Sequence, residues 1–219
     1  MIINFRYFLY LSVFIAHSFA VAGSYEEFFG AIRSDSDITI RTLLKRGFDP
    51  NTLSPNGEPA LILALREPAL KVVAALLESP TIQVEFRTVK DESPLMLAAL
   101  RGYTEVCKQL IAHDADVNKP GWTPLHYAAT SGHGKIVELL LDNHAYIDAS
   151  SPNGSTPLML ASKYGTFDVV KQLLEAGADP SIKNDLQLTA IDFAMQVQRD
   201  DIVRLIAAAV RGKKKPGAW

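Results

Sequence analysis

Seven residues near the middle of the chain, Thr123-Pro-Leu-His-Tyr-Ala-Ala129, decide how this sequence folds. A threonine suits the N-cap of a helix, where its hydroxyl oxygen accepts a hydrogen bond from a backbone N–H of the first turn. Proline suits the next position, because its missing N–H would have no helical partner there. The two short alanines let neighbouring helices approach closely. The stretch therefore predicts a short helix that packs tightly between others.

The same pattern recurs along the chain. Related segments begin at Pro59, Ser93, Thr156 and Thr189, and a weaker one begins at Phe28. One apolar residue can be aligned in all six segments, at intervals of 33, 34, 30, 33 and 33 residues: Phe28, Leu61, Leu95, Leu125, Leu158 and Ile191. A regular period near 33 indicates a repeat protein, in which each unit buries its apolar face against its neighbours.

Each repeat continues with a second helix and a turn. Apolar residues such as Ile136, Val137 and Leu140 follow with helical spacing. After the second helix we expect a residue in the left-handed conformation, and the equivalent positions hold Gly47, Asp114, His144 and Gly177. Asn-Gly pairs favour tight reversals, so we expect projecting turns at residues 51–57 and 148–154.

The Thr123–Ala129 motif and its period resemble the ankyrin family, whose repeat carries a Thr-Pro-Leu-His signature. The resemblance covers residues 24 to 211. It implies an all-α fold, an ankyrin-repeat solenoid of about six helix-turn-helix repeats with projecting β-turns. It also implies that His126 is a framework residue whose imidazole bonds to the N-cap hydroxyl and nearby backbone, and that His133 starts a second helix.

Two connections depart from the repeat. The second repeat ends in Glu78-Ser-Pro80 in place of a glycine turn, and its connection is one residue longer. The connection at residues 117–122 is three residues short, which accounts for the interval of 30 and predicts a truncated finger with a notch beside it. Trp122 borders this notch. Two interpretations of Trp122 stay open: it contacts a partner, or it covers the hydrophobic gap.

The N-terminus is typical of a secretion signal. Arg6 precedes an apolar run at residues 7–16, and Ala20-Val-Ala22 matches a signal-peptidase site. A membrane-spanning helix needs about 20 apolar residues. The apolar run is shorter than this, which favours a signal peptide that is cleaved. A retained signal-anchor stays open as an alternative, because Arg6 and the amino terminus are the only positive charges before the apolar run. We therefore predict a signal peptide at 1–22, an ankyrin-repeat domain at 23–211 and a short basic tail at 212–219, with no membrane span after cleavage.

Composition narrows the possible functions. The 219 residues are 48% hydrophobic and carry a net charge of −2, which indicates a folded protein and gives no reason to expect nucleic acid as the main partner. The single cysteine, Cys107, cannot form an intramolecular disulfide and is expected in the core. No nucleophile-elbow, P-loop or dinucleotide motif occurs, and the histidines lack zinc-site spacing. We therefore expect the chain to have no enzymatic activity and to bind no metal or cofactor.

The expected function is therefore binding to another protein. In the family that the chain resembles, the turn tips and the ends of the first helices form a concave binding surface. Aromatic and arginine side chains are enriched in binding hot spots. The candidate partner-binding residues are Trp122, Tyr164, Arg101, Arg66, Lys119 and Lys163. The signal and the repeats together resemble bacterial exported ankyrin-repeat proteins, which implies a monomeric adaptor or scaffold in the periplasm or cell envelope. A structural or chaperone-like accessory and a secreted host-directed effector stay as alternatives.

Overall fold

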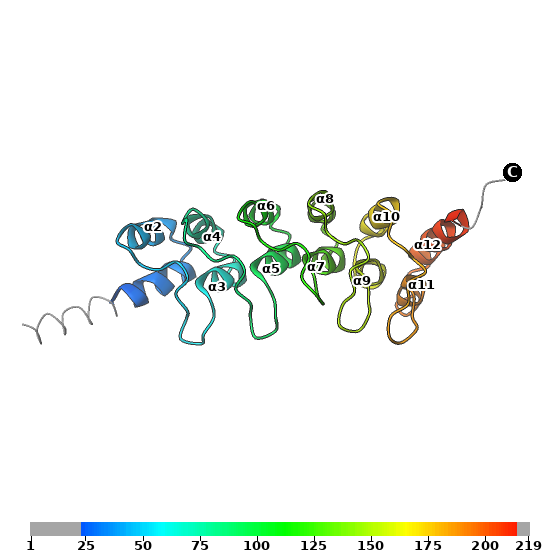
Figure 1. Ribbon diagram of the computed structural model, residues 1–219, viewed down its shortest axis with the longest axis horizontal. Coiled ribbons are helices and arrows are strands. Elements are labelled where there is room, and N and C mark those ends of the chain that lie inside the picture. Colours follow the sequence, from blue (N-terminus) through cyan, green and yellow to red (C-terminus); the bar gives the residue numbers. More distant parts are fainter. Residues whose placement is uncertain (1–22, 214–219) are drawn as a thin grey trace, which may run out of the picture. The chain divides into compact units, whose positions relative to one another are not determined.

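The computed structural model describes residues 23–213 of the 219-residue chain. The chain divides into two compact units between Gln83 and Val84, and short paired helices make up each unit (Figure 1). None of the helices in the described part is long and apolar enough to cross a membrane. The predicted signal peptide at 1–22 and the end of the predicted tail lie outside the described residues.

The described part of the first unit, residues 23–83, contains four helical segments: residues 23–33, α2 (Asp37–Lys45), α3 (Ala60–Arg66) and α4 (Leu70–Leu77). Phe28 is fully buried and packs against Phe48, with 4.6 Å between the ring centroids. The Asp35 carboxylate accepts the N–H groups of Lys71 and Val72 at 2.9 and 3.0 Å. These donors start α4 and have no helical partner, so the carboxylate joins successive repeats and stabilises the helix start.

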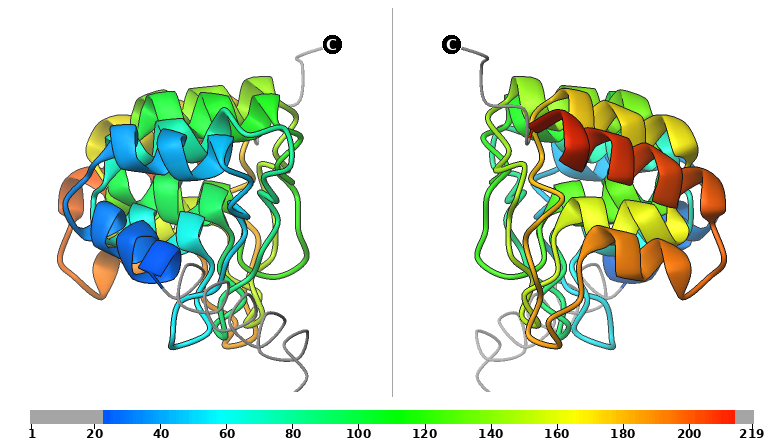
Figure 2. Two further views of the ribbon diagram at one scale, coloured as in Figure 1. Left: turned by 90° about the vertical axis from the view of Figure 1, so that its left-hand side faces the viewer. Right: turned by 90° about the vertical axis from the view of Figure 1, so that its right-hand side faces the viewer.

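Between residues 84 and 213, the second unit contains four helix pairs: α5 (Pro94–Arg101) with α6 (Thr104–Ala112), α7 (Pro124–Ser131) with α8 (Gly134–Asp142), α9 (Pro157–Tyr164) with α10 (Phe167–Glu175), and α11 (Ala190–Met195) with α12 (Asp200–Lys213). In Figure 1, α5, α7 and α9 form one layer and α6, α8 and α10 form a second. The loops project from the first layer. Figure 2 shows α11 and α12 next to each other at the C-terminal end of the unit, where α12 also packs on α10.

The predicted helix starts are confirmed. Ser93, Thr123 and Thr156 are N-caps whose side-chain oxygens accept the N–H of the third helical residue, and a proline follows each of them. The third residue also reaches back to the N–H of the cap. Its acceptor is a thioether sulfur in Met96 and Met159, both at 3.4 Å, and an imidazole nitrogen in His126 at 3.2 Å. The position needs an acceptor of suitable reach, and two different chemistries, a thioether and an imidazole, supply it in these three helices.

The predicted turns are also confirmed. The four positions after the second helices are left-handed, with φ of 87° at Gly47, 62° at Asp114, 65° at His144 and 104° at Gly177. The hairpin at residues 51–57 closes through Ser54 N–H, which donates to the Glu58 carbonyl at 2.8 Å. The hairpin at 148–154 closes through Ser151 N–H, which donates to the Ser155 carbonyl at 3.0 Å.

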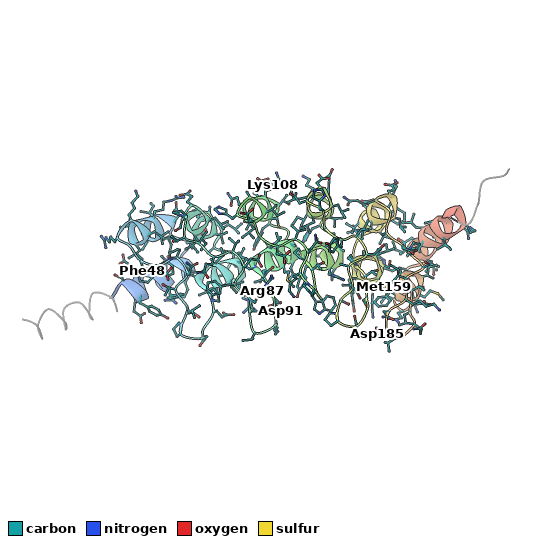
Figure 3. The ribbon with its side chains drawn as sticks, viewed as in Figure 1. Phe48, Arg87, Asp91, Lys108, Met159 and Asp185 are labelled. Atoms are coloured by element: carbon teal, nitrogen blue, oxygen red, sulfur yellow. The ribbon has the colours of Figure 1, made fainter. Side chains whose placement is uncertain are left out.

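The core follows the aligned apolar position. Phe28, Leu61, Leu95, Leu125 and Leu158 are buried, whereas Ile191 in the terminal repeat is half-buried. Cys107 on α6 is 0% exposed, and burial raises the pKa of its thiol to about 12. Its neighbour Lys108 points outward from α6 (Figure 3) and pairs with Glu105 at 2.8 Å. Cys107 is therefore the core thiol that the sequence predicted.

Candidate interaction site

The site begins at the short connection before α7. Figure 1 shows that this turn projects less than the loops before α5 and α9, which confirms the predicted truncated finger. Gly121, with φ of 80°, turns the chain directly into Trp122 and the N-cap Thr123. Because the connection is short, the surface beside it is formed by the first-layer helices themselves.

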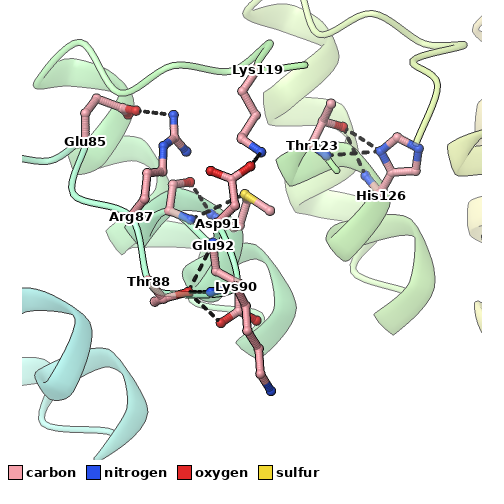
Figure 4. Close-up of polar contacts among 11 residues, drawn as sticks. Glu85, Arg87, Thr88, Lys90, Asp91, Glu92, Lys119, Thr123 and His126 are labelled. Atoms are coloured by element: carbon pink, nitrogen blue, oxygen red, sulfur yellow. Dashed lines mark hydrogen bonds and ion pairs between the residues drawn. The ribbon is translucent and has the colours of Figure 1, made fainter. Parts of the chain in front are cut away.

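Lys119 corrects one expectation. Its side chain lies in the short connection, is only 8% exposed, and forms an ion pair with Asp91 of the preceding hairpin (Figure 4). The Lys119 ammonium, hydrogen-bonded to Asp91, lowers the pKa of that carboxyl. The truncation brings the connection close to the hairpin, so the amino group is used inside the unit. Lys119 therefore does not present a free cation to a partner as the sequence suggested.

The same hairpin is held by a second charged group. Glu85 accepts the backbone N–H of Asp116 at 2.8 Å and pairs with Arg87 at 2.5 Å (Figure 4). These contacts connect the hairpin at residues 85–92 to the chain that leads into the short connection. One edge of the site is thus fixed by ion pairs and hydrogen bonds within the second unit.

An open pocket of about 250 Å³ lies on the first helices of the second unit. Side chains from three neighbouring first-layer helices and from the short connection line it, and most of them are aromatic or aliphatic: Leu100 from α5, Trp122 from the connection, His126, Tyr127 and Thr130 from α7, and Leu160 and Tyr164 from α9. Sites for drug-sized ligands and cofactors measure about 300–1,000 Å³. This pocket is smaller, and its size suits one large side chain.

The structure shows Trp122 packed on the framework and at the pocket, and contact with a partner stays a prediction. Its ring is half-buried and packs edge-on against the His126 ring, with 5.4 Å between centroids, so it covers the framework histidine. It also lines the pocket. The ring is therefore held in place by packing while part of its surface is available.

His126 is confirmed as a framework residue. Its Nε2–H donates to the Ser155 carbonyl at 3.0 Å, because a carbonyl can only accept. Nδ1 is then the acceptor, and it lies 2.9 Å from the Thr123 hydroxyl (Figure 4). Burial lowers the pKa of His126 to about 4. The imidazole is neutral near pH 7 with both nitrogens engaged, so it offers no base or metal ligand.

Tyr164 and Lys163 form the α9 side of the site. Tyr164 is 59% exposed and lines the pocket. The Lys163 ammonium donates to the Gln196 side-chain oxygen at 3.0 Å and lies 5.4 Å from the centroid of the Tyr164 ring. Arg101 is exposed at the end of α5, directly after the pocket residue Leu100. The structure therefore brings Trp122 and Tyr164 together and places a basic residue next to a pocket residue on α5 and on α9.

Arg66, the remaining predicted residue, belongs to the first unit. It lies at the end of α3 and forms an ion pair with Glu58 of the hairpin that precedes that helix. Its side chain stays partly exposed.

A comparison with known protein families identifies the repeats. The model described as "Ankyrin repeats (3 copies)" matches residues 80–151 and 143–215. This chain belongs to the ankyrin-repeat family. Ankyrin repeats bind other proteins and are generally not catalytic, and the all-helical repeat fold of the described residues agrees with this assignment.

Individual ankyrin-repeat relatives are similar over most of this chain and over a smaller part of their own length. "Ankyrin repeat and KH domain-containing protein mask-1" of Caenorhabditis elegans is 33% identical over 164 residues, which is 73% of this chain and 6% of the relative. "B-cell lymphoma 3 protein homolog" of Mus musculus is 29% identical over 184 residues, 81% of this chain and 41% of the relative. These relatives are animal proteins, so the resemblance to exported bacterial members stays a prediction.

The sequence did not single out Tyr127 or Leu160 as site residues. The pKa of the Tyr127 hydroxyl is raised, mainly by burial and to a lesser extent by the negative charges of Glu92 and Asp91. A signal for both was present, because Leu160 precedes Tyr164 by four residues and Tyr127 precedes Thr130 by three. Residues at these spacings share one face of a helix. Extending the predicted surface one turn back along each ankyrin helix would have found them.

Proposed function

We propose that this chain is a non-catalytic interaction module that binds a partner protein through the first-layer helices of its second unit, across α5, α7 and α9. The open apolar pocket at Trp122 and Tyr164 carries the proposal. Tryptophan and tyrosine are enriched in binding hot spots, which cluster in well-packed pockets. The known behaviour of the ankyrin family, whose repeats bind other proteins, supports it.

The histidine at the pocket and the cysteine in the core support a binding role over a catalytic one. A catalytic base or nucleophile needs a reachable group whose pKa suits the reaction. His126 is buried with a pKa of about 4, and both of its nitrogens are hydrogen-bonded. Cys107 is buried with a pKa raised to about 12. Neither group is suited to act near neutral pH.

Photo-crosslinking in the native host tests the binding face. A photoreactive phenylalanine analogue replaces Tyr164, which is exposed at the pocket, or Lys135, which is exposed on α8 in the other layer. We expect the Tyr164 variant to form a product of one discrete mass with a second protein, and the Lys135 variant to form none. Equal products at both positions, or a product only at Lys135, would contradict the proposal.

We further infer that the module is exported and acts as a monomer in the periplasm or cell envelope. The support is Arg6, the apolar run at residues 7–16 and the Ala20-Val-Ala22 pattern. When the full chain is expressed in a Gram-negative bacterium, intact-mass measurement of the periplasmic fraction should find a protein that begins at Gly23. A membrane-bound product that retains residues 1–22 would indicate an anchor, and a full-length product in the cytoplasm would contradict export.

A further inference from the structure

We propose that the pocket recognises an exposed segment of the partner protein in which a leucine or aromatic side chain stands next to an acidic residue. This rests on the proposed function and names the chemistry of the partner. The apolar side chain enters the pocket between Trp122 and Tyr164, and the neighbouring carboxylate pairs with Lys163.

The dimensions of the pocket indicate which side chain of the partner can enter it. Its volume of about 250 Å³ lies below the about 300–1,000 Å³ of sites for drug-sized ligands and is too small for a folded element. Trp122, Tyr127 and Tyr164 provide three aromatic rings around it. Aromatic rings pack well against aliphatic groups and, edge to face or offset, against other aromatic rings. A single leucine, phenylalanine or tryptophan side chain meets both conditions.

Trp122 forms the wall of the pocket at the short connection. It occupies the position before the N-cap of α7 and is half-buried. The equivalent residue before the N-cap of α9 is Ser155, which is 1% exposed. The position before α7 therefore holds a large, partly exposed aromatic side chain, where the position before α9 buries a small polar one.

The charges around the pocket indicate which kind of residue stands next to the apolar side chain that enters it. Among the described residues, Lys163 has the neutral Gln196 amide as its hydrogen-bond partner and forms no ion pair with a carboxylate. Its ammonium lies 5.4 and 5.8 Å from the ring centroids of Tyr164 and Phe193. On the α9 side, an incoming carboxylate would therefore meet a cation that no carboxylate already neutralises.

The other side of the pocket is already paired within the chain. Asp91 of the hairpin at residues 85–92 forms an ion pair with Lys119. The charges of Glu92 and Asp91 contribute, after burial, to raising the pKa of Tyr127. Lys163 is therefore the contact that we assign to the carboxylate of the bound segment.

A displayed library of random linear peptides tests this chemistry. The purified chain is used for selection, and one enriched peptide is synthesised for calorimetry. We expect the enriched peptides to share a leucine, phenylalanine or tryptophan next to an aspartate or glutamate. Thr130→Phe, which fills the pocket, should weaken binding at least about tenfold. Ser131→Phe, on the same helix but outside the lining, is the matched control and should leave binding within about twofold.

The carboxylate contact is tested by a double-mutant cycle. Lys163→Gln and replacement of the acidic residue of the peptide by its amide should each weaken binding, and together they should cost less than the sum. Lys135→Gln on α8 is the matched control. Circular dichroism checks the fold of each variant. If Thr130→Phe does not fold, Tyr164→Glu takes its place, because that side chain is exposed.

Three results would overturn the inference: no enrichment of an apolar residue beside an acidic one, equal binding to the pocket-filled variant, or a concentration-dependent dimer that Thr130→Phe abolishes. The last result would make a second copy of this chain the occupant. If crosslinking at Tyr164 still captures a partner in these cases, the proposed function stands and only the assigned chemistry fails. If Tyr164 captures nothing, the proposed function fails as well.

Discussion

The connections that lead into α7 and α9 differ by three residues but end in the same way. Each arrives at a threonine N-cap followed by proline and a fully buried leucine, Leu125 or Leu158. The longer connection is closed by its own backbone, with Gly154 N–H donating to the Ser151 carbonyl at 2.8 Å. The shorter one is tied to the preceding hairpin through Lys119. The helix start is fixed by its cap, so the connection can change length without changing the helix.

The largest expected effect tests whether the two helices are equally well packed. Leu125→Ala and Leu158→Ala should each lower the free energy of unfolding by about 2–5 kcal/mol, because each leaves a cavity between neighbouring repeats. Urea denaturation followed by circular dichroism measures both. An unchanged curve for Leu125→Ala would show that the repeat register is wrong. A much smaller loss at Leu125 than at Leu158 would show that the truncation loosens its helix.

The second expected effect is a pH dependence of the free energy of unfolding that comes from the cap of α7 and has no equivalent in α9. His126 has a pKa of about 4 in the folded chain, against about 6.5 in the unfolded chain. Between these values the unfolded state binds more protons, so the free energy of unfolding rises with pH. This contribution is fully present above about pH 6.5, falls as the pH drops toward 4, and amounts to about 3 kcal/mol.

The other repeats supply the control for this pH effect. Met96 and Met159 occupy the position equivalent to His126 and cap their helices without titrating. His126→Met should therefore fold and lose the pH-dependent component between pH 4 and 6.5. Urea titrations at several pH values in this range measure it. An identical pH dependence in parent and variant would show that other groups control the acid stability.

The third effect concerns the surface beside the short connection. Trp122→Ala, Tyr164→Ala and Arg101→Ala should each weaken partner binding by about 1–2 kcal/mol or more, the range of hot-spot residues. Calorimetry with the crosslinked partner, once purified, measures this. Ser155→Ala at the complete hairpin is the counterpart and should leave affinity unchanged. If Trp122→Ala unfolds the chain, its role is packing, and if all three variants fold and bind normally, the site lies elsewhere.

The smallest effect tests the caps themselves. Thr123→Ala and Thr156→Ala each remove an oxygen that accepts a first-turn N–H, and each should cost about 1 kcal/mol. Thermal unfolding of the two variants gives the comparison. Equal losses would show that the cap works independently of the connection before it. A clearly larger loss at Thr123 would show that the short connection depends on its cap for position.

The sequence predicted the fold well because its determinants are local. The Thr-Pro caps and the left-handed positions act within a few residues, and the period and the missing three residues can be counted directly. The division between Gln83 and Val84 was not predicted, although it follows the atypical Glu78-Ser-Pro80 connection. Periodicity counts repeats but does not report how strongly two neighbours contact each other.

The candidate site was predicted in part. Trp122 and Tyr164 meet at one pocket because the repeat register alone places them on the same surface. Lys119 was predicted as a partner-binding residue, but its side chain is buried and paired with Asp91, 28 residues earlier in the chain. The distance between these two residues is set by the packing of two loops, and no sequence pattern encodes it. Tyr127 and Leu160 could have been found from helical spacing.

The burial of Cys107 makes its thiol a natural probe of local opening in this protein. The thiol lies in α6, is fully buried, and stays protonated because burial raises its pKa to about 12. An alkylating reagent reacts with the thiolate, so it modifies only those molecules in which α6 has separated from its neighbours. The rate of alkylation therefore reports how often the structure around α6 opens, without any added label. Because Cys107 is the one cysteine of the chain, every modified molecule records the same event.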